Sequence, residues 1–250
     1  MFTVNERNRV RDRIVELARA DRRILATAFV GSLADSSTGD RWSDLDVGFA
    51  LVDDISLEGV VEEWTRGLQD EFRAVHLFDL PHLSTLYRVF LLPGNLQVDL
   101  SFTPKADFRP LGPKFKLVYG NAIEPKHSPP PSPQYMFGLA VHHLVRARIC
   151  IERGKLWQAA YWTNEARNQA LSLACLDRGL PSSYGRGFDN LPREILQLFE
   201  RTLIGSLDQD SLLRVLSKTL EEVMRNSQRV GDAVSRLEPQ LRELGSATME

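Results

Sequence analysis

Residues 31–46 read GSLADSSTGDRWSDLD and join two apolar runs, ILATAFVG at 24–31 and LDVGFALV at 45–52. Both runs have the length and composition of buried strands. Asp44 and Asp46 stand two residues apart where the second run begins, so in an extended chain they project from the same face. Carboxylates placed this close repel each other, and a divalent cation with oxygen ligands would offset the repulsion.

A third carboxylate follows in a predicted hairpin, in which YRVFLL at 87–92 and LQVDLSF at 96–102 flank the turn residues Pro-Gly-Asn. Strand alternation puts Gln97 and Asp99 on one face and Val98 on the other. An aspartate is disfavoured inside a strand, which suggests a functional role for Asp99. If this strand lies beside 45–52, the three aspartates form a cluster suited to two metal ions about 3.5–4 Å apart.

Gly31 and Ser32 end the first apolar run and are candidates for binding phosphate. A glycine at the end of a strand lets the backbone come close to an anion. The hydroxyl of Ser32 and free N–H groups of the turn can donate hydrogen bonds to it. One small motif would then hold a triphosphate while the aspartates hold metal ions.

The remaining patterns divide the chain into two parts. Further elements of the first part are helices at about 5–21 and after a capping Ser56, and strands at 74–80 and 116–119. This predicts an α/β (α+β) domain with a mixed sheet over residues 1–124. PKHSPPPSPQ at 125–134 reads as a proline-rich linker. Helical patterns alone follow over 135–250, which predicts an all-α helical bundle, with helices from 135 and near 155–177, 191–205, 209–229 and 232–243.

The overall composition narrows the function classes. The 250 residues carry a formal net charge of -2, which argues against a nucleic-acid partner. The N-terminal residues lack the apolar core of a signal peptide, and no apolar run approaches the ~18 residues of a membrane span. Cys150 and Cys175 lie in apolar helical patterns without metal-ligand spacing and read as core residues. We therefore expect a cytoplasmic protein without membrane contact.

The order Gly-Ser, loop, Ser-Asp-Leu-Asp at 43–46 and a later Val-Asp-Leu at 98–100 resembles the nucleotidyltransferase fold of the DNA polymerase beta superfamily. With a helical second domain, the chain is similar to antibiotic nucleotidyltransferases that act on aminoglycosides or lincosamides. The resemblance implies Mg²⁺-dependent transfer of a nucleoside monophosphate from ATP or another NTP to a hydroxyl, with release of pyrophosphate.

The resemblance also assigns roles to residues. Asp44 and Asp46 would ligate both metal ions, and Asp99 would ligate the catalytic one and help to deprotonate the acceptor. Gly31 and Ser32 would hold the β- and γ-phosphates, and Ser43 is grouped with them. Many relatives carry a basic residue soon after Gly-Ser, whereas this chain has LADSSTG at 33–39. We take Arg41 as the replacement for that charge.

In the helical part, Trp157, Tyr161 and Glu165 fall on one helical stripe. If this face lines the acceptor site, Glu165 is a candidate general base. The competing interpretation is a surface glutamate, or one paired with Arg148 or Arg167. We interpret Arg148 itself as a salt-bridged surface residue.

Three functions are weighed. The first is a transferase acting on a small-molecule hydroxyl, including antibiotic-resistance enzymes, with the helical bundle binding the acceptor. The second modifies a protein or a tRNA, and the third is a nucleotide-binding module without turnover. Two-subunit sites occur in similar enzymes, so a homodimer stays open.

Overall fold

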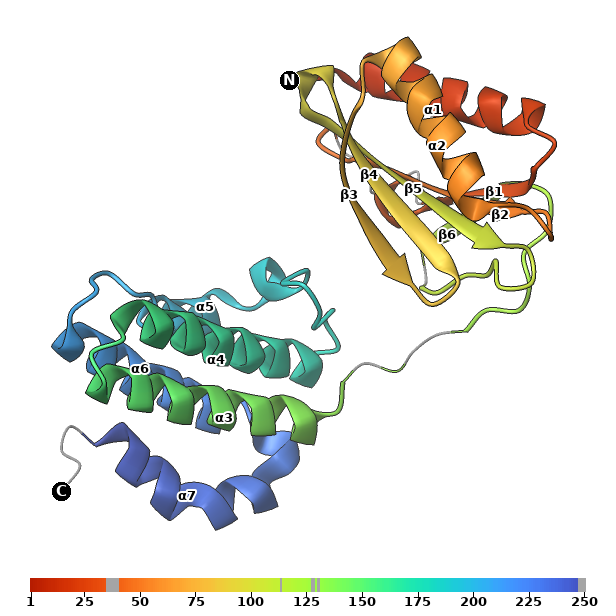
Figure 1. Cartoon of the computed structure of the whole chain (residues 1–250). Coiled ribbons are helices and arrows are strands. Elements are labelled where there is room, and N and C mark those ends of the chain that lie inside the picture. The colour runs from red at the N-terminus through yellow and green to blue at the C-terminus, as the bar shows by residue number, and fades with distance from the viewer. Residues whose placement is uncertain (35–40, 113, 127–128, 130, 247–250) are drawn as a thin grey trace. The chain divides into compact units, whose positions relative to one another are not determined.

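The computed structural model describes residues 1–34, 41–112, 114–126, 129 and 131–246 (Figure 1). The chain forms two compact units, Met1–Ser128 and Pro129–Glu250, and the division falls within the predicted linker. Each unit has its own hydrophobic core, so each is described by itself below.

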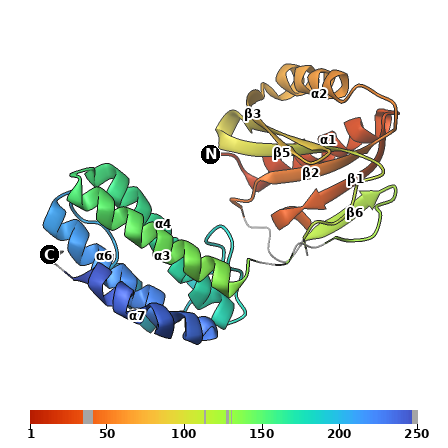
Figure 2. The same cartoon turned by 60° about the horizontal axis from the view of Figure 1, so that its bottom comes forward.

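The first unit is built on a six-stranded sheet. Its strands are β1 (Ile24–Val30), β2 (Leu45–Leu51), β3 (Val75–His82), β4 (Thr85–Leu92), β5 (Leu96–Pro104) and β6 (Phe115–Tyr119). The strand order is β3-β4-β5-β2-β1-β6, and β6 lies beside β1 at one edge (Figure 2). The β2–β5 pair is parallel and the other pairs are antiparallel. The predicted mixed sheet is therefore confirmed.

Two helices, α1 (Val4–Ala20) and α2 (Leu57–Phe72), pack on one face of this sheet. Ser56 caps α2 as expected, because its hydroxyl accepts the amide of Gly59 at 3.1 Å. Trp64 of α2 packs on Phe49 of β2 with ring centroids 4.8 Å apart. The buried strand residues alternate with polar ones, so the opposite face is left for the aspartates. The sheet residues that face the helices include Leu45, Val47, Phe49, Val98, Leu100 and Phe102.

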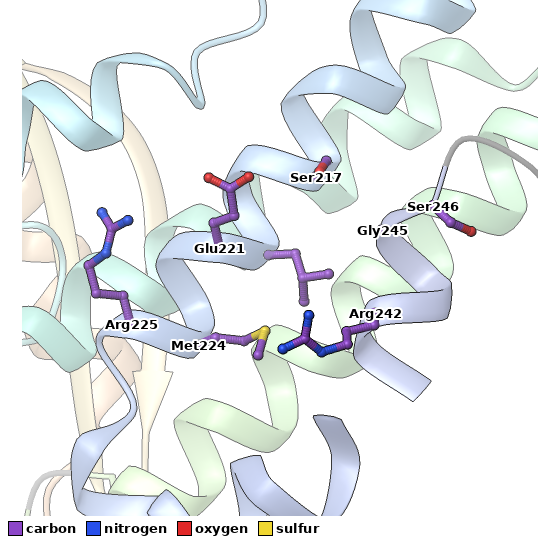
Figure 3. A pocket seen from close by; sticks show the side chains of 8 residues that line it. Ser217, Glu221, Met224, Arg225, Arg242, Gly245 and Ser246 are labelled. Atoms are coloured by element: carbon purple, nitrogen blue, oxygen red, sulfur yellow. The ribbon is translucent and has the colours of Figure 1, made fainter. Parts of the chain in front are cut away.

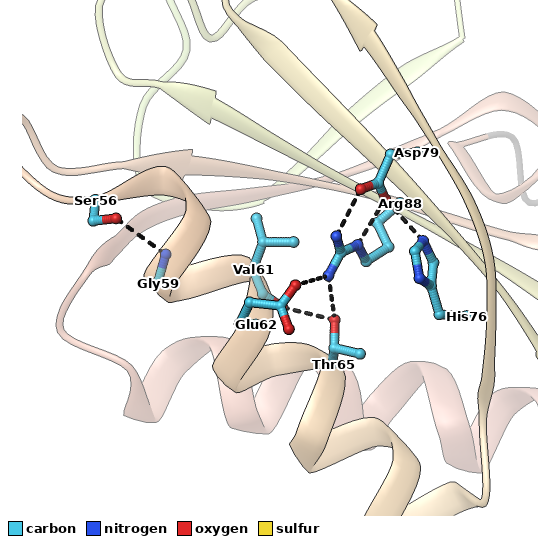
Figure 4. Close-up of polar contacts among 8 residues, drawn as sticks. All are labelled: Ser56, Gly59, Val61, Glu62, Thr65, His76, Asp79 and Arg88. Carbon is cyan, nitrogen blue, oxygen red and sulfur yellow. Dashed lines mark hydrogen bonds and ion pairs between the residues drawn. The ribbon is translucent and has the colours of Figure 1, made fainter.

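A polar network ties the β3–β4 edge of the sheet to α2 (Figure 4). The buried guanidinium of Arg88 donates two hydrogen bonds to Asp79 on β3, at 2.7 and 2.6 Å. It also donates to Glu62 at 2.8 Å and to Thr65 at 2.9 Å on α2. His76 contacts the same Asp79 carboxylate at 2.9 Å. Since a buried charge needs such partners, the network fixes which face of β3 meets the helix.

The second unit is helical, and none of its described residues is in a strand. Its helices are α3 (Pro133–Glu152), α4 (Leu156–Asp177), α5 (Arg193–Glu200), α6 (Gln209–Arg225) and α7 (Gly231–Gly245). This confirms the predicted all-α bundle, although α3 begins two residues before the expected 135. Its core includes many alanines, such as Ala140, Ala147, Ala159, Ala166 and Ala170, which let α3 and α4 approach closely.

One expectation for the second unit is refined, and another is confirmed. The predicted helix at 209–229 ends at Arg225, because the Asn226 side chain donates to the carbonyl of Glu222 at 2.9 Å and a 3₁₀ turn follows. Cys150 and Cys175 are buried and free, as expected for core residues. None of the described helices has the length and apolar character to cross a membrane.

Candidate metal and nucleotide site

The structure brings Asp44, Asp46 and Asp99 together. Asp46 on β2 is the direct register partner of Asp99 on β5 in the parallel pair. Asp44 lies one residue before β2, and one carboxylate oxygen of each aspartate lies within 4.8 Å of the others. All three side chains are half-buried. Three converging carboxylates can ligate divalent cations, which is the chemistry that the sequence pattern predicts.

The surroundings of Asp99 disfavour its charged form. Burial raises the pKa of Asp99, and the negative charge of Asp44 adds to this rise. Gln97 works against it, because its amide donates to both Asp99 oxygens at 3.0 and 3.2 Å. Burial likewise raises the pKa of Tyr87, with a further contribution from Asp46. A bound cation would relieve the repulsion among these groups.

Gly31 is required where it stands. Its φ of 63° lies in the left-handed region, and a Cβ there would come within 2.5 Å of Oδ2 of Asp46. The turn can therefore reach the aspartate only with glycine at this position. One expectation needs correction: the Gly31 amide is not free for an anion, because it donates to the carbonyl of Lys114 at 3.1 Å.

Ser32 remains a candidate phosphate ligand. It follows Gly31 in a short 3₁₀ turn, Gly31–Ala34. Its Oγ is buried and has no hydrogen-bond partner among the described residues. A buried hydroxyl without a partner costs free energy unless a ligand or water satisfies it. This orphaned atom belongs to the residue that follows Gly31, which approaches Asp46, and it fits an oxygen-rich ligand.

The other predicted nucleotide ligands have mixed placements. The Arg41 guanidinium lies over the ring of Trp42, 4.1 Å from its centroid, so its proposed role as the replacement charge stays a prediction. In the loop at 33–39, where relatives carry a basic residue and this chain does not, positions 35–39 lie outside the described residues. Ser43 is buried directly before Asp44.

Sequence reasoning missed Arg7 of α1. The residue is 6% exposed, and its Nη1 donates to the carbonyl of Ser43 at 3.4 Å. The contact holds the backbone from which Asp44 projects. A signal was present in the sequence, because Arg7 continues the 3–4 spacing of Val10 and Ile14 on the buried face of its helix.

Glu165 lies on α4 in the second unit and is half-buried. Its negative charge raises the pKa of the neighbouring His143, but burial of that imidazole has the larger effect and lowers it. Trp157 and Tyr161, which lie on the same helical stripe as Glu165, are exposed to solvent. The role of Glu165 as a base stays a prediction.

The expected arginine partners of Glu165 bond elsewhere. Arg148 is 2% exposed and pairs with Glu152 at 2.7 Å, so its interpretation as a surface residue is wrong. It is buried because its Nη1 also donates to the carbonyl of Leu244 at 3.3 Å, at the end of α7. Arg167 donates to the carbonyl of Thr202 at 3.4 Å.

A hollow of about 540 Å³ in the second unit lies between α6 and α7 (Figure 3). Its basic side chains already have acidic partners on their own helices: Arg225 pairs with Glu222, and Arg242 pairs with Glu238. Leu220 and Met224 supply apolar lining. The hollow contains no cluster of candidate catalytic groups, so we assign it no role.

No family model matches the chain, and no curated protein matches it either. Among solved structures, the chain is similar to an aminoglycoside 6-adenyltransferase from Bacillus subtilis, with 12% identity, a TM-score of 0.40 and coverage of 98% of this chain and 99% of that one. It is also similar to a nucleotidyltransferase-like protein from Exiguobacterium sibiricum 255-15, with 13% identity, a TM-score of 0.40 and coverage of 96% and 88%. Neither likeness assigns an activity, so the functional proposal rests on the carboxylate cluster.

Proposed function

We propose that this protein is a metal-dependent nucleotidyltransferase that transfers AMP from ATP to a hydroxyl group of a small molecule and releases pyrophosphate. The observation that carries the proposal is the convergence of Asp44, Asp46 and Asp99 from two neighbouring parallel strands. Burying three neighbouring carboxylates costs free energy unless cations bind them, and nucleotidyl transfer uses cations that are held close together.

The residues present fit divalent metal ions. Asp44 and Asp46 would hold two Mg²⁺ ions, and Asp99 would complete the shell of one. When bound, these ions neutralise charge on the phosphates and lower the pKa of the acceptor hydroxyl. The hydroxyl of Ser32, which has no partner among the described residues, would donate a hydrogen bond to the β- and γ-phosphates. Gly31 before it allows the turn to approach Asp46 closely. Ser43 and Arg41 are the further nucleotide ligands that we propose.

The reaction forms one bond and breaks another. The acceptor oxygen attacks the α-phosphorus, and the bond from this phosphorus to the β-bridging oxygen breaks. Pyrophosphate leaves with that electron pair, and the acceptor proton passes to a carboxylate. Asp99 is the first candidate for this base, because the sequence resemblance assigns it that role and its carboxylate lies within the cluster, and Glu165 is the second.

The acceptor is a hydroxylated small molecule, and the sequence resemblance makes aminoglycoside and lincosamide antibiotics the first classes to test. The expected role of the helical unit in binding the acceptor stays a prediction, and a homodimer is compatible with the proposal. The net charge of -2 disfavours a tRNA target. Incubation with labelled ATP and whole lysate, followed by separation of protein, RNA and small molecules, distinguishes these targets.

The decisive experiment measures pyrophosphate release from ATP with and without Mg²⁺. We expect release that EDTA abolishes and that Asp44→Ala reduces to background. Asp70→Ala is the matched control, since Asp70 is an exposed carboxylate of α2 in the same unit. Unchanged release by Asp44→Ala would refute the proposal. Tight ATP binding without any pyrophosphate release would instead identify a nucleotide-binding module.

A further inference from the structure

One row of register partners crosses the sheet through the carboxylate cluster. Asp46 of β2 pairs with Asp99 of β5, Asp99 pairs with Val89 of β4, and Val89 pairs with Phe78 of β3. Gly31, directly after β1, lies so close to Asp46 that a Cβ there would come within 2.5 Å of its Oδ2. The row therefore runs from the Gly31 turn, through the carboxylates, to the β3 edge.

Register partners project from the same face of a sheet, so β3 and β4 extend the face that carries the aspartates. We call the six side chains that they place there the β3–β4 strip: Val75, Phe78, Leu80, Tyr87, Val89 and Leu91. Val75, Phe78 and Leu80 are 59%, 52% and 56% exposed. The intervening Asp79 and Arg88 turn to the opposite face, where Arg88 donates to Asp79 and to Glu62 of α2 (Figure 4).

Over β1 and β2, the same face of the sheet is covered by Phe108. Phe108 packs against Ala28 of β1 and Ala50 of β2, and a Cβ on Gly48 would meet its ring at 3.4 Å. The strip thus adjoins the carboxylates through Val89, which is buried beside Asp99, and its exposed apolar side chains lie farther out, on β3. Exposed apolar side chains gathered in one place are typical of a binding surface.

The in-line geometry of phosphoryl transfer indicates which substrate lies over this strip. In an in-line displacement, the attacking oxygen and the leaving group lie on opposite sides of the phosphorus. Under the proposed function, Ser32, which follows β1, is the ligand of the leaving pyrophosphate. The attacking hydroxyl must then approach from the side of β5, β4 and β3.

We propose that the β3–β4 strip is the acceptor subsite, and that the acceptor carries an apolar or aromatic ring face next to the hydroxyl that is modified. This inference rests on the proposed function and narrows its substrate class. None of the six side chains is charged, so the strip favours an amphiphilic acceptor over a polycationic one. Neighbouring strands lie about 4.8 Å apart, so Phe78 and Asp99 are separated by about 10 Å, the span of one or two rings.

The first test measures binding without turnover. Saturation-transfer NMR compares 4-nitrophenyl β-glucoside with methyl β-glucoside, in the presence of Mg²⁺ and a non-hydrolysable ATP analogue. We expect the aryl glucoside to bind at least tenfold more tightly, and Phe78→Ser and Leu80→Ser to remove this advantage. Leu83→Ser is the control, because Leu83 is 92% exposed in the turn after β3 and outside the strip. Equal binding of the two glucosides overturns the proposal.

The second test measures pyrophosphate release with a lincosamide and with an aminoglycoside as acceptor. We expect the amphiphilic lincosamide to be preferred, and Phe78→Ser to raise the KM for it at least fivefold while the KM for ATP stays within twofold. A raised KM for ATP would assign the strip to the nucleoside. A dimer that Leu80→Ser dissociates in sedimentation would assign it to a second copy of this chain. Either result overturns the subsite.

The two proposals fail in different ways. If wild-type protein releases pyrophosphate in an Asp44-dependent manner and the strip variants match it for every acceptor, the subsite alone is wrong. If wild-type protein shows no Asp44-dependent release, the transferase proposal is wrong, whatever the strip binds in the NMR experiment.

Discussion

Asp46 and Asp99 are direct register partners on adjacent parallel strands, with their carboxylates on the same face of the sheet. Like charges placed opposite each other in a sheet are destabilising. Gln97 is the neighbour that bonds Asp99, and it offsets only part of the cost of burial. Burial and the neighbouring charge of Asp44 therefore disfavour the charged form of Asp99, and a bound cation would offset both effects.

Asp99→Asn should separate stability from metal binding. With EDTA present at neutral pH, we expect the variant to melt a few degrees above the wild type, because a half-buried negative charge beside Asp44 is removed. Isothermal titration with Mn²⁺ should show weaker binding by at least tenfold. Lower melting in EDTA would contradict the repulsion that we infer.

Gly31→Ala should impair the site while leaving the fold in place. The new methyl group would come within 2.5 Å of Asp46 in a backbone conformation with φ of 63°, so the turn or the carboxylate must move. We expect a loss of about 1 kcal/mol in the free energy of unfolding. Pyrophosphate release should fall at least tenfold. The matched control is Gly67→Ala in α2, where a Cβ meets nothing within 4 Å and helix propensity should stabilise the protein slightly.

Asp79→Asn should destabilise the first unit in a pH-dependent way. Hydrogen bonds from Arg88 hold the pKa of Asp79 below its usual value of 3.8. A lowered pKa in the folded state gives stability that is present above 3.8 and is lost as pH falls through the folded-state value. We expect a loss of roughly 1–3 kcal/mol at pH 7, since Arg88 is buried.

The pH profile of this loss is the informative measurement. Denaturant unfolding of wild type and Asp79→Asn should converge as the pH falls below about 3.8. The control is Asp53→Asn, which removes the partner of Lys105 in an exposed ion pair and should cost less than about 1 kcal/mol at any pH. A constant difference for Asp79→Asn down to acid pH would show that its charge is not the cause.

Arg7→Gln should weaken the site through the backbone. Loss of the bond to the Ser43 carbonyl frees the segment that presents Asp44, so we expect the Kd for Mn²⁺ to rise several-fold. Saturating metal should restore most of the rate, because every metal ligand is still present. Arg9→Gln, an exposed neighbour on α1, should leave the Kd unchanged. An unchanged Kd in Arg7→Gln would limit Arg7 to a packing role.

Glu165→Gln distinguishes the two interpretations of that residue. A general base contributes at least a hundredfold in typical enzymes, so its loss should lower turnover by well over tenfold. A near-normal rate would make Glu165 a helix-surface residue and leave Asp99 as the base. The pH–rate profile should lose its acidic limb only in the variant that removes the base.

Much of the fold follows from local sequence patterns. The alternation of Leu45, Val47 and Phe49 with Asp46 and Gly48 already assigns the two faces of β2. The sequence also predicts that Asp99 belongs to the cluster. The Asp44–Asp46 pair repels itself and an aspartate is disfavoured within a strand, and a common bound cation would account for both. The helical bundle follows from 3.6-residue spacing after the prolines.

Other features depend on contacts between distant segments, which local patterns do not encode. The Gly31 amide is taken by Lys114, which meets it only because β6 pairs with β1. Arg148 is buried because the end of α7 returns to α3. The β3–β4 strip also escaped sequence reasoning, since assigning its face requires the register shift between His76 and Phe78.

The hydrogen bonds on either side of the division between the units have a practical consequence. The amide of Lys126 donates to Pro110, which secures the end of the first unit to its own fold. Ser132 caps α3 by accepting the amide of Tyr135 at 3.2 Å. A cut between Lys126 and Ser132 would spare both bonds and both cores. The halves should therefore be obtainable as two independent polypeptides, and mixing them would reveal whether covalent connection is needed for turnover.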